Sequence, residues 1–184
     1  MQTRGYNGFS YADIAVQLGV TKASLHYHFA SKAELGSALI ARYDAVFSEA
    51  LSSIDRQTRA PKEKLDRYVG LYDAVMRNDR MCLCGMLAAE YATLPAPMRK
   101  QLKVFFDANE RWLTQVLEEG RSAGSLVFKE AANERARVLL GAFEGAMLVA
   151  RSYGDARRFT AAASHLLADL DAGEQPAPRA GRRK

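Results

Sequence analysis

The sequence contains few of the residues that break helices or cross-link chains, with 5 prolines and 2 cysteines among its 184 residues. It has no run of the roughly 18 apolar residues that a membrane helix requires. No apolar run follows a basic start at the N-terminus, which argues against a signal peptide. Cys82 and Cys84 are too close in sequence for a structural disulfide, as is usual in a reducing compartment. We therefore expect a cytoplasmic protein without a membrane segment.

Strand signals are also missing from the sequence. Apolar residues make up 48% of the chain, but no segment shows the alternation of apolar and polar residues that is typical of a half-buried strand. The apolar residues recur instead at intervals of three and four, which indicates amphipathic helices. The sequence therefore predicts an all-α fold.

The formal net charge of +5 is concentrated at the C-terminal end. Residues 173–184, GEQPAPRAGRRK, hold four Lys and Arg against one Glu, and this Pro-, Gly- and Arg-rich composition predicts a disordered basic tail. Residues 1–60 hold six Lys and Arg against five Asp and Glu. Charge alone therefore does not single out a nucleic-acid partner for the N-terminal part of the chain.

Residues 10–29, SYADIAVQLGVTKASLHYHF, have the pattern of two short helices joined by a tight turn. Ser10 and Thr21 are residue types that cap helix N-termini. Gly19 is expected to end the first helix, because glycine enters the left-handed conformation at little cost. Leu25 and Phe29 are expected to point back toward that helix. This arrangement predicts a helix-turn-helix, whose second helix lies in the major groove of DNA.

A third, longer helix is predicted from Ser31 to about residue 53, and it connects this motif to the rest of the chain. Lys32 lies in its first turn, where the helix dipole favours acidic residues. We therefore expect Lys32 to serve an anionic partner such as the DNA backbone.

The run DIAVQLGVTKASLHYHFASKAEL resembles the DNA-binding domain of the TetR/AcrR family of one-component transcriptional regulators. The order of features is the same: D-I-A, a Gly-Val turn, a recognition helix of small residues, an aromatic-x-His-Phe ending, and Ser-Lys-x-x-Leu. The resemblance implies a helix-turn-helix DNA-binding domain over residues 1–48 and a helical ligand-binding and dimerisation domain over residues 49–172, followed by the tail. The rest of the chain matches only as a helical domain.

Members of the family carry a complete first helix before the helix-turn-helix, and MQTRGYNGF corresponds only to its end. The first helix is therefore expected to be largely missing, either because the start codon has been assigned too late or because the regulator is fragmentary. The first explanation is preferred, since everything downstream has the pattern of an intact regulator.

The resemblance implies a ligand-responsive regulator, in the first place a repressor that a small molecule releases from its operator. Its implied partners are pseudo-palindromic double-stranded DNA, a small-molecule effector and a second copy of the chain. A different class remains open: a helical dimeric interaction protein that has lost DNA binding along with its first helix. No glycine-rich phosphate loop, catalytic triad or metal motif indicates an enzyme, and we expect no cofactor or metal.

The start of the recognition helix supplies the candidate base contacts. Lysine donates to guanine acceptors, serine bonds to several bases, and alanine contacts a thymine methyl, so Lys22, Ala23 and Ser24 are predicted to contact base edges. Of His26 and His28, one is expected in the groove and the other against the core of the domain. For His28 the two roles are equally consistent with the sequence.

Candidate phosphate contacts follow from the resemblance. Tyr27 and Lys32 match family positions that hold phosphate oxygens. Ser10 and Thr21 lie at helix N-termini, where backbone N–H groups attract anions. Helix capping alone would also explain these two residues, and it is compatible with phosphate contact.

Three later predicted helices, over residues 62–78, 82–92 and 98–121, carry apolar stripes that are expected to converge on an effector pocket. Aromatic and methionine side chains with a few polar groups are the usual lining of such a site, although a filled core is the alternative for each residue. Asn109 favours a pocket, because an amide on an apolar stripe requires a buried partner. Glu90 and Glu144 also lie in apolar stretches and are candidates for a ligand contact or a salt bridge. The candidate pocket residues are Tyr72, Met76, Met86, Phe105, Asn109 and Trp112.

The segment CLCGMLAAE suggests a second mode of regulation, in which an electrophile or oxidant modifies Cys82 or Cys84. Reactive thiols need a lowered pKa, which the nearby Arg80 and a helix start at Cys82 would supply. Burial as small apolar residues is the alternative. Two cysteines without further ligands do not predict a zinc site.

The predicted helix over residues 133–153 is apolar almost all round, so part of it is expected to face a second subunit. Small residues four positions apart allow two helices to approach closely. The resemblance also places the last two long helices in a two-fold, four-helix interface. The candidate interface residues are Gly141, Gly145, Leu166 and Leu167.

Overall fold

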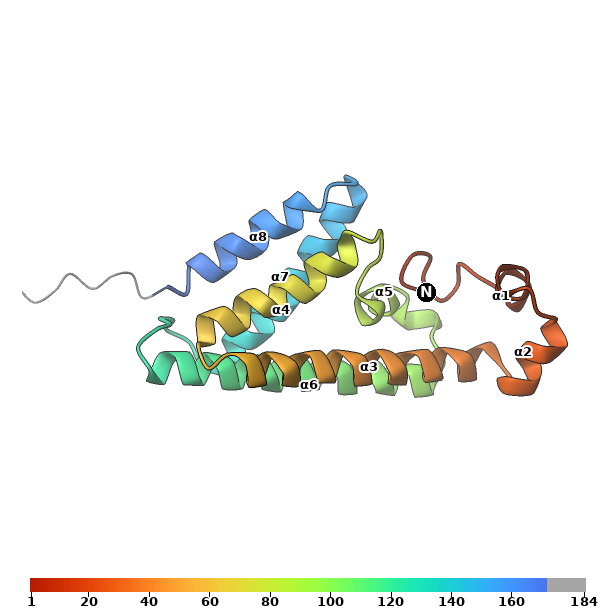
Figure 1. Cartoon of the computed structure of the whole chain (residues 1–184), viewed down its shortest axis with the longest axis horizontal. Coiled ribbons are helices and arrows are strands. Elements are labelled where there is room, and N and C mark those ends of the chain that lie inside the picture. Colours follow the sequence, from red (N-terminus) through yellow and green to blue (C-terminus); the bar gives the residue numbers. More distant parts are fainter. Residues whose placement is uncertain (172–184) are drawn as a thin grey trace, which may run out of the picture.

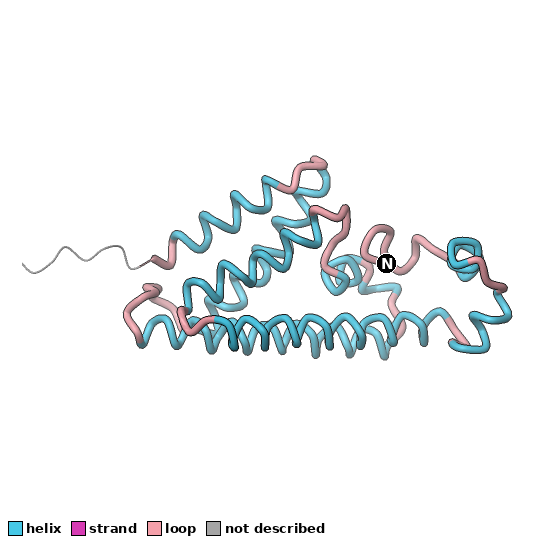
Figure 2. The backbone as a smooth tube through the Cα atoms, viewed as in Figure 1, coloured by secondary structure: helices cyan, strands magenta, loops and turns pink. Residues whose placement is uncertain are grey.

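The computed structural model describes residues 1–171, and within this range the chain forms helices and no strand (Figures 1 and 2). The predicted tail lies outside the described residues. The helices are α1 (Tyr11–Leu18), α2 (Lys22–His28), α3 (Lys32–Gln57), α4 (Pro61–Met76), α5 (Leu83–Ala89), α6 (Ala96–Ser122), α7 (Ala132–Ser152) and α8 (Arg157–Ala168), with a 3-10 turn at Tyr91–Thr93. The all-α prediction is confirmed.

The helix-turn-helix forms from the local signals that the sequence carries. The hydroxyl of Ser10 accepts from the backbone N–H of Asp13, whose carboxylate accepts from the backbone N–H of Ser10 at 2.6 Å, so the two residues form a capping box. Gly19 ends α1 with a φ of 66°, in the left-handed region. Thr21 caps α2 by accepting from the N–H of Ser24 at 3.1 Å.

Two hydrophobic cores share the helix α3. The small core of the helix-turn-helix contains Tyr11, Ala15 and Leu25, and Leu35 of α3 packs against it. The large core contains Ile40 and further apolar residues of α3 together with α4 to α8. With 26 residues, α3 is about 39 Å long, and it connects the two cores without a break.

The large domain is built around α3 and α6, which lie side by side along the length of the molecule (Figure 1). Helix α7 packs against α6 and α8, and α4 packs against α6, α7 and α8. The short α5 contacts α3 and α6 near the N-terminal segment. Helices α1 and α2 therefore lie at one end of an elongated molecule.

Two helix ends differ from the sequence prediction. Helix α3 continues to Gln57, because Ile54 is buried and its carbonyl still accepts from the N–H of Thr58. The helix predicted over residues 82–92 ends at Ala89, where Glu90 leaves the helical conformation and its carboxylate accepts from the backbone N–H groups of Tyr6 and Asn7.

No helix among residues 1–171 is long and apolar enough to cross a membrane.

Candidate DNA-binding surface and effector region

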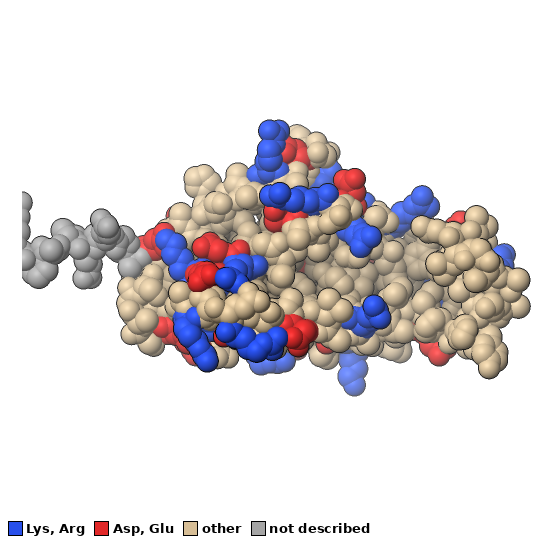
Figure 3. All heavy atoms as spheres, viewed as in Figure 1, with Lys and Arg blue, Asp and Glu red and all other residues tan. Residues whose placement is uncertain are grey.

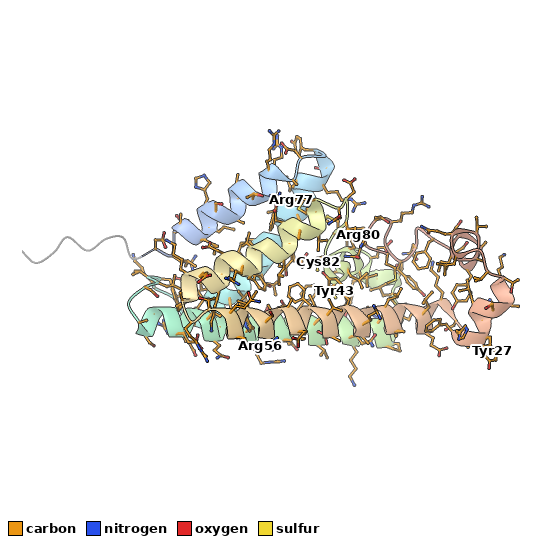
Figure 4. All side chains as sticks on the ribbon, in the orientation of Figure 1. Tyr27, Tyr43, Arg56, Arg77, Arg80 and Cys82 are labelled. Carbon is orange, nitrogen blue, oxygen red and sulfur yellow. The ribbon has the colours of Figure 1, made fainter. Side chains whose placement is uncertain are left out.

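The outer face of α2 is polar and open. Leu25 is buried in the small core, whereas Lys22, Ala23 and Ser24 are all exposed. Tyr27 is 86% exposed, and Figure 4 shows it at the end of the molecule, away from the large domain. A large aromatic side chain held this far into solvent has no packing role inside its own chain. This face is therefore available to a partner.

The structure separates the roles of the two histidines of α2. His26 lies against the ring of Tyr11, with centroids 4.6 Å apart, and its Nδ1 is 3.3 Å from the carbonyl oxygen of Ala30. His28 is exposed and contacts only the edge of Tyr27, at 5.3 Å between centroids. His26 is thus the histidine that packs against the domain, and His28 lies on the open face.

Lys32 has a different partner from the one expected. Its ammonium donates to the carbonyl oxygen of Phe9 and lies 4.6 Å from the ring centroid of Tyr6 and 4.4 Å from that of Phe9. These contacts hold residues 6–9 against the start of α3. Sequence reasoning treated Tyr6 and Phe9 as the remnant of a helix and missed that their rings attract a cation. The placement of Lys32 does not support the expected phosphate contact.

On one face of the molecule, few charged side chains lie over α1 and α2 (Figure 3). On the face shown in Figure 3, the end of the molecule that carries these helices is mostly uncharged, and the charged side chains gather over the large domain. Ser10 and Thr21, the expected helpers in phosphate binding, are exposed and cap their own helices. Any DNA contact here therefore depends on short polar side chains and helix N-termini more than on net charge.

The six residues predicted to line an effector pocket form a packed core instead. Tyr72, Met76, Phe105 and Asn109 are buried, and Met86 and Trp112 pack partly buried against the same core. The ring of Phe47, from α3, fills the space between the stripes and contacts the rings of Tyr68, Tyr72 and Phe105. At this place the stripes of α4 and α6 converge on a third helix, and an effector pocket lined by these six residues stays a prediction that the structure does not favour.

Asn109 finds its partners inside the protein. Its side-chain oxygen accepts from the hydroxyl of Tyr68 at 3.0 Å, and its side-chain nitrogen donates to the carbonyl oxygen of Phe105 at 2.9 Å. The hydroxyls of Tyr68 and Tyr72 are 3.0 Å apart. The buried amide was correctly expected to need a partner, but the partner is a tyrosine and not a ligand.

A buried lysine joins α3, α4 and α6 far from α2. Lys64, with 3% of its side chain exposed, lies 2.9 Å from Asp55 and 3.0 Å from Glu119. Burial disfavours its charged form, but the hydrogen bonds to both carboxylates outweigh this and raise the pKa of the ammonium. Trp112 adds to the network by donating its indole N–H to Asp55 at 2.9 Å. This network fixes the C-terminal end of α3.

Both cysteines are buried, which differs from what a thiol sensor needs. Burial raises the pKa of the Cys82 and Cys84 thiols, and the carboxyl group of Glu144 raises both further. Cys82 caps α5, but Arg80 is exposed and does not lower the pKa of either thiol. The thiols are therefore protonated at neutral pH, and a sensor role for Cys82 or Cys84 stays a prediction that the structure does not favour.

The two glutamates in apolar stretches have different surroundings. Glu90 holds the N-terminal segment, as described above. Glu144, on α7, points its carboxyl group into the protein toward Gly85 of α5, and neither of its oxygens receives a regular hydrogen bond from the described residues. Burial raises the pKa of Glu144 to about 7.

A groove of about 420 Å³ opens between α3 and the start of α5. We call it the α3–α5 groove. It is lined by Met1, Gln2, Leu39, Arg42, Tyr43, Val46, Arg80 and Leu83. Figure 4 shows Tyr43, Cys82 and Arg80 in this same region. Sequence reasoning missed the groove, because Tyr43 and Leu83 belong to stripes that were assigned to the core.

The outward face of α7 is open in the protomer. Gly141 is exposed, and a Cβ atom added at Gly141 or Gly145 would meet nothing within 4 Å. Val138 and Leu148 lie exposed on the same side of the helix. Leu166 and Leu167 of α8 are only half-buried and pack partly against the core of their own chain. An apolar strip along α7 is therefore left without a partner among residues 1–171.

Two family models match the chain. The model described as bacterial regulatory proteins of the tetR family matches residues 1–39, and the model described as the tetracyclin repressor-like C-terminal domain matches residues 61–166. A TetR-family regulator from Agrobacterium tumefaciens has a solved structure that is 34% identical and superposes with a TM-score of 0.88, covering 91% of this chain and 89% of that one.

Curated relatives agree with the family models. The transcriptional regulator AcuR of Cereibacter sphaeroides is 28% identical over 152 residues, which is 80% of this chain and 69% of AcuR. The HTH-type transcriptional repressor NemR of Escherichia coli is 26% identical over 154 residues, which is 80% of this chain and 76% of NemR. The helix-turn-helix with an open α2 face, the helical second domain and these matches lead to one conclusion: the chain belongs to the TetR family of bacterial transcriptional regulators.

Proposed function

We propose that this protein is a cytoplasmic transcriptional repressor that binds a pseudo-palindromic operator as a homodimer and releases it when a small molecule binds the large domain. The observation that carries the proposal is the exposed face of α2, on which Lys22, Ser24, Tyr27 and His28 stand free of contacts with the large domain. A polar helix face of this kind at the tip of a helix-turn-helix is suited to enter the major groove.

The homodimer supplies what a single α2 lacks. One helix of seven residues presents too small a surface for specific DNA binding. The open strip along α7 offers a self-complementary patch, and a two-fold contact there sets the two α2 helices at a fixed separation. Two half-sites about one helical turn apart, arranged as an inverted repeat, are the expected operator.

Selection of binding sequences from a random pool of double-stranded DNA tests the proposal. We expect enrichment of an inverted repeat, with the recovered sequence bound far more tightly than random DNA at physiological salt. Recovery of no common sequence, with weak and equal binding to all members of the pool, would overturn it. The interaction-protein alternative would then be the better description of the chain.

A further inference from the structure

The carboxyl group of Glu144 is the one buried acidic group in this region that the described chain leaves without a cation. The Cys82 thiol forms a weak hydrogen bond with it that lowers its pKa, and its charge also raises the pKa of the Cys84 thiol and of the phenols of Tyr43, Tyr68 and Tyr72. None of these groups carries a positive charge, and the thiol of Cys82 is only a weak donor. A buried carboxyl group normally has a partner, so this one is suited to a donor that comes from outside the chain.

Tyr43 connects the carboxyl group to the surface. Its side chain lines the α3–α5 groove, and its hydroxyl lies close to the Cys82 thiol and to Glu144. The volume of the groove, about 420 Å³, is within the range of small-molecule sites. Tyr43 is therefore the lining residue of the groove that also senses the charge of Glu144.

The same groove carries positive charge where it meets solvent. Arg42 and Arg80 both line it, both are exposed, and neither side chain forms an ion pair or a hydrogen bond with another described residue. Unpaired guanidinium groups bind carboxylates through paired N–H donors. The α3–α5 groove thus has a basic mouth, and Tyr43 connects its lining to the surroundings of the buried Glu144.

We propose that the α3–α5 groove and Glu144 form the effector site, and that the effector is a small zwitterion with a protonated amine at one end and an anionic group at the other. The amine donates to Glu144 at the inner end, and the anionic group pairs with Arg42 and Arg80 at the mouth. This inference names the effector class of the repressor and rests on the proposed function.

The charges of the proposed site favour a zwitterion over a dicarboxylate or an alcohol. An ammonium group forms charge-assisted hydrogen bonds with a carboxylate and is attracted to the faces of aromatic rings such as that of Tyr43. A ligand with a carboxylate at both ends is repelled by Glu144, and an alcohol offers only a neutral hydrogen bond. The expected order of affinity is therefore amino acid, then simple amine or alcohol, then simple carboxylate.

Glu144 is not among the residues that line the groove, so we expect entry of the amine to move the ring of Tyr43, which lines the groove and senses the carboxyl group. Tyr43 belongs to α3 and packs on Phe47 of the same helix and on Phe105 of α6. Displacement of this ring therefore pushes α3 relative to α6. Since α3 begins at the helix-turn-helix, the push reaches the DNA-binding end without any contact between effector and DNA.

A series of ω-amino acids from 3-aminopropionate to 6-aminohexanoate tests the site, with butylamine, butanol and butyrate as single-ended probes. Binding is measured by isothermal titration calorimetry on the full chain, and operator release by fluorescence anisotropy. We expect one chain length to bind best, at least tenfold more tightly than any single-ended probe, and to release the operator.

Variants separate the two ends of the site. Glu144→Gln keeps the shape of the side chain and is expected to lower the affinity for the best amino acid and for butylamine by tenfold or more. Arg42→Gln combined with Arg80→Gln is expected to lower the affinity for the amino acid but not for butylamine. Glu118→Gln, an exposed glutamate on α6, is the matched control and leaves both affinities unchanged.

Either of two results would overturn the inference: no member of the series binds, or Glu144→Gln binds all members as the unchanged protein does. Calorimetry needs no DNA, so these results are independent of whether the chain recognises an operator. Binding of the amino acid without any operator recognition would instead contradict the proposed function and leave the site in place.

Discussion

The side chains on the open face of α2 divide into two groups by what they are expected to contact in DNA. Lys22 and Ser24 lie at the start of the helix, where base edges are within reach, and Tyr27 lies farther along and outward. Lys22→Ala is expected to cost about 1–3 kcal/mol on the selected operator and much less on random DNA. Anisotropy titrations of both DNAs measure the difference, and an equal loss on both would contradict base contact by Lys22.

Tyr27→Phe provides the contrasting test. Removal of one hydroxyl that bonds to a phosphate oxygen is expected to weaken binding to every sequence by a similar factor, equivalent to about 1 kcal/mol. Titrations of operator and random DNA under the same salt conditions measure it. Lys103→Ala, an exposed lysine on α6, is a control for general loss of charge and is expected to leave both affinities nearly unchanged.

Glu144 is also expected to make stability depend on pH. Its pKa is about 7 in the folded chain and near the ordinary 4.5 when the chain unfolds. Below pH 4.5 both states are protonated. As the pH rises from 4.5 to 7, the unfolded state loses the proton first, so the free energy of unfolding falls, by about 3 kcal/mol once the pH is above 7.

The variant Glu144→Gln removes this loss. It is expected to resemble the unchanged protein at pH 5 and to be more stable by up to about 3 kcal/mol at pH 8. Urea unfolding at a fixed protein concentration between pH 5 and pH 8 measures the effect, with Glu118→Gln as the exposed control. A parallel pH dependence in both variants would show that Glu144 is not the titrating group.

At the scale of the helices, the Lys64 network is expected to behave as one unit. Asp55→Asn or Glu119→Gln alone leaves Lys64 with one carboxylate, whereas the double variant leaves a buried ammonium with none. The double variant is expected to lose about 3–5 kcal/mol of unfolding free energy, which is more than the sum of the single losses. Urea unfolding of all three variants gives the coupling energy.

A surface ion pair of the same helix α3 serves as the reference for that experiment. Arg56 and Glu49 are both mostly exposed, and Glu49→Gln is expected to change stability by less than about 1 kcal/mol. If the losses from Asp55→Asn and Glu119→Gln are equally small and simply additive, Lys64 does not depend on its two carboxylates.

The presence of the helices and the turn of the helix-turn-helix could be predicted from the sequence, because helix caps and apolar periodicity depend on residues that are close together in the chain. Ser10, Gly19 and Thr21 act within a few residues of themselves, and the structure places them as expected. The same periodicity shows which side of a helix is apolar but not which helix it meets. Periodicity therefore could not show that Phe47 fills the place of the expected pocket or that Glu144 faces Gly85.

Charged side chains were the hardest to place, since their partners are distant in the sequence. Lys32 binds the segment around Phe9, 23 residues earlier, and Lys64 binds Glu119, 55 residues later. A position in the first turn of a helix indicates that a lysine has an unusual role but does not identify the partner. The exposed face of α2, in contrast, was predictable, because the buried Leu25 determines which side of the helix points inward.

For the whole molecule, the open strip on α7 predicts how the dimer can be broken. A Cβ atom at Gly145 meets no atom of the described residues within 4 Å, so Gly145→Leu is expected to leave the protomer folded while it intrudes twice into a two-fold interface. The variant is expected to be a helical monomer with much weaker operator binding. Light scattering, circular dichroism and anisotropy measure these three properties.

Gly70→Leu is the matched control for the dimer test, because Gly70 lies exposed on α4 and also has open space around it. It is expected to remain dimeric. A helical Gly145→Leu variant that also stays dimeric would remove the α7 strip from the interface. Glutamate at Leu166 and Leu167 is a less decisive test, because both side chains pack partly against the core of their own chain and the change would also unfold the protomer.

Asp55 is held by Lys64 and Trp112, so a sideways force on α3 is expected to tilt this helix about its C-terminal end. Tyr43 lies 12 residues from Asp55, or about 18 Å along the helix, and Lys32 lies 23 residues away, or about 35 Å. A sideways shift at Tyr43 is therefore about doubled at Lys32, where α3 meets the helix-turn-helix. A shift of about 1 Å in each protomer changes the separation of the two α2 helices by up to about 4 Å, against a half-site spacing of about 34 Å. In the proposed dimer, a modest rearrangement beside the groove would therefore be enough to move the two α2 helices out of register with the turns of the DNA.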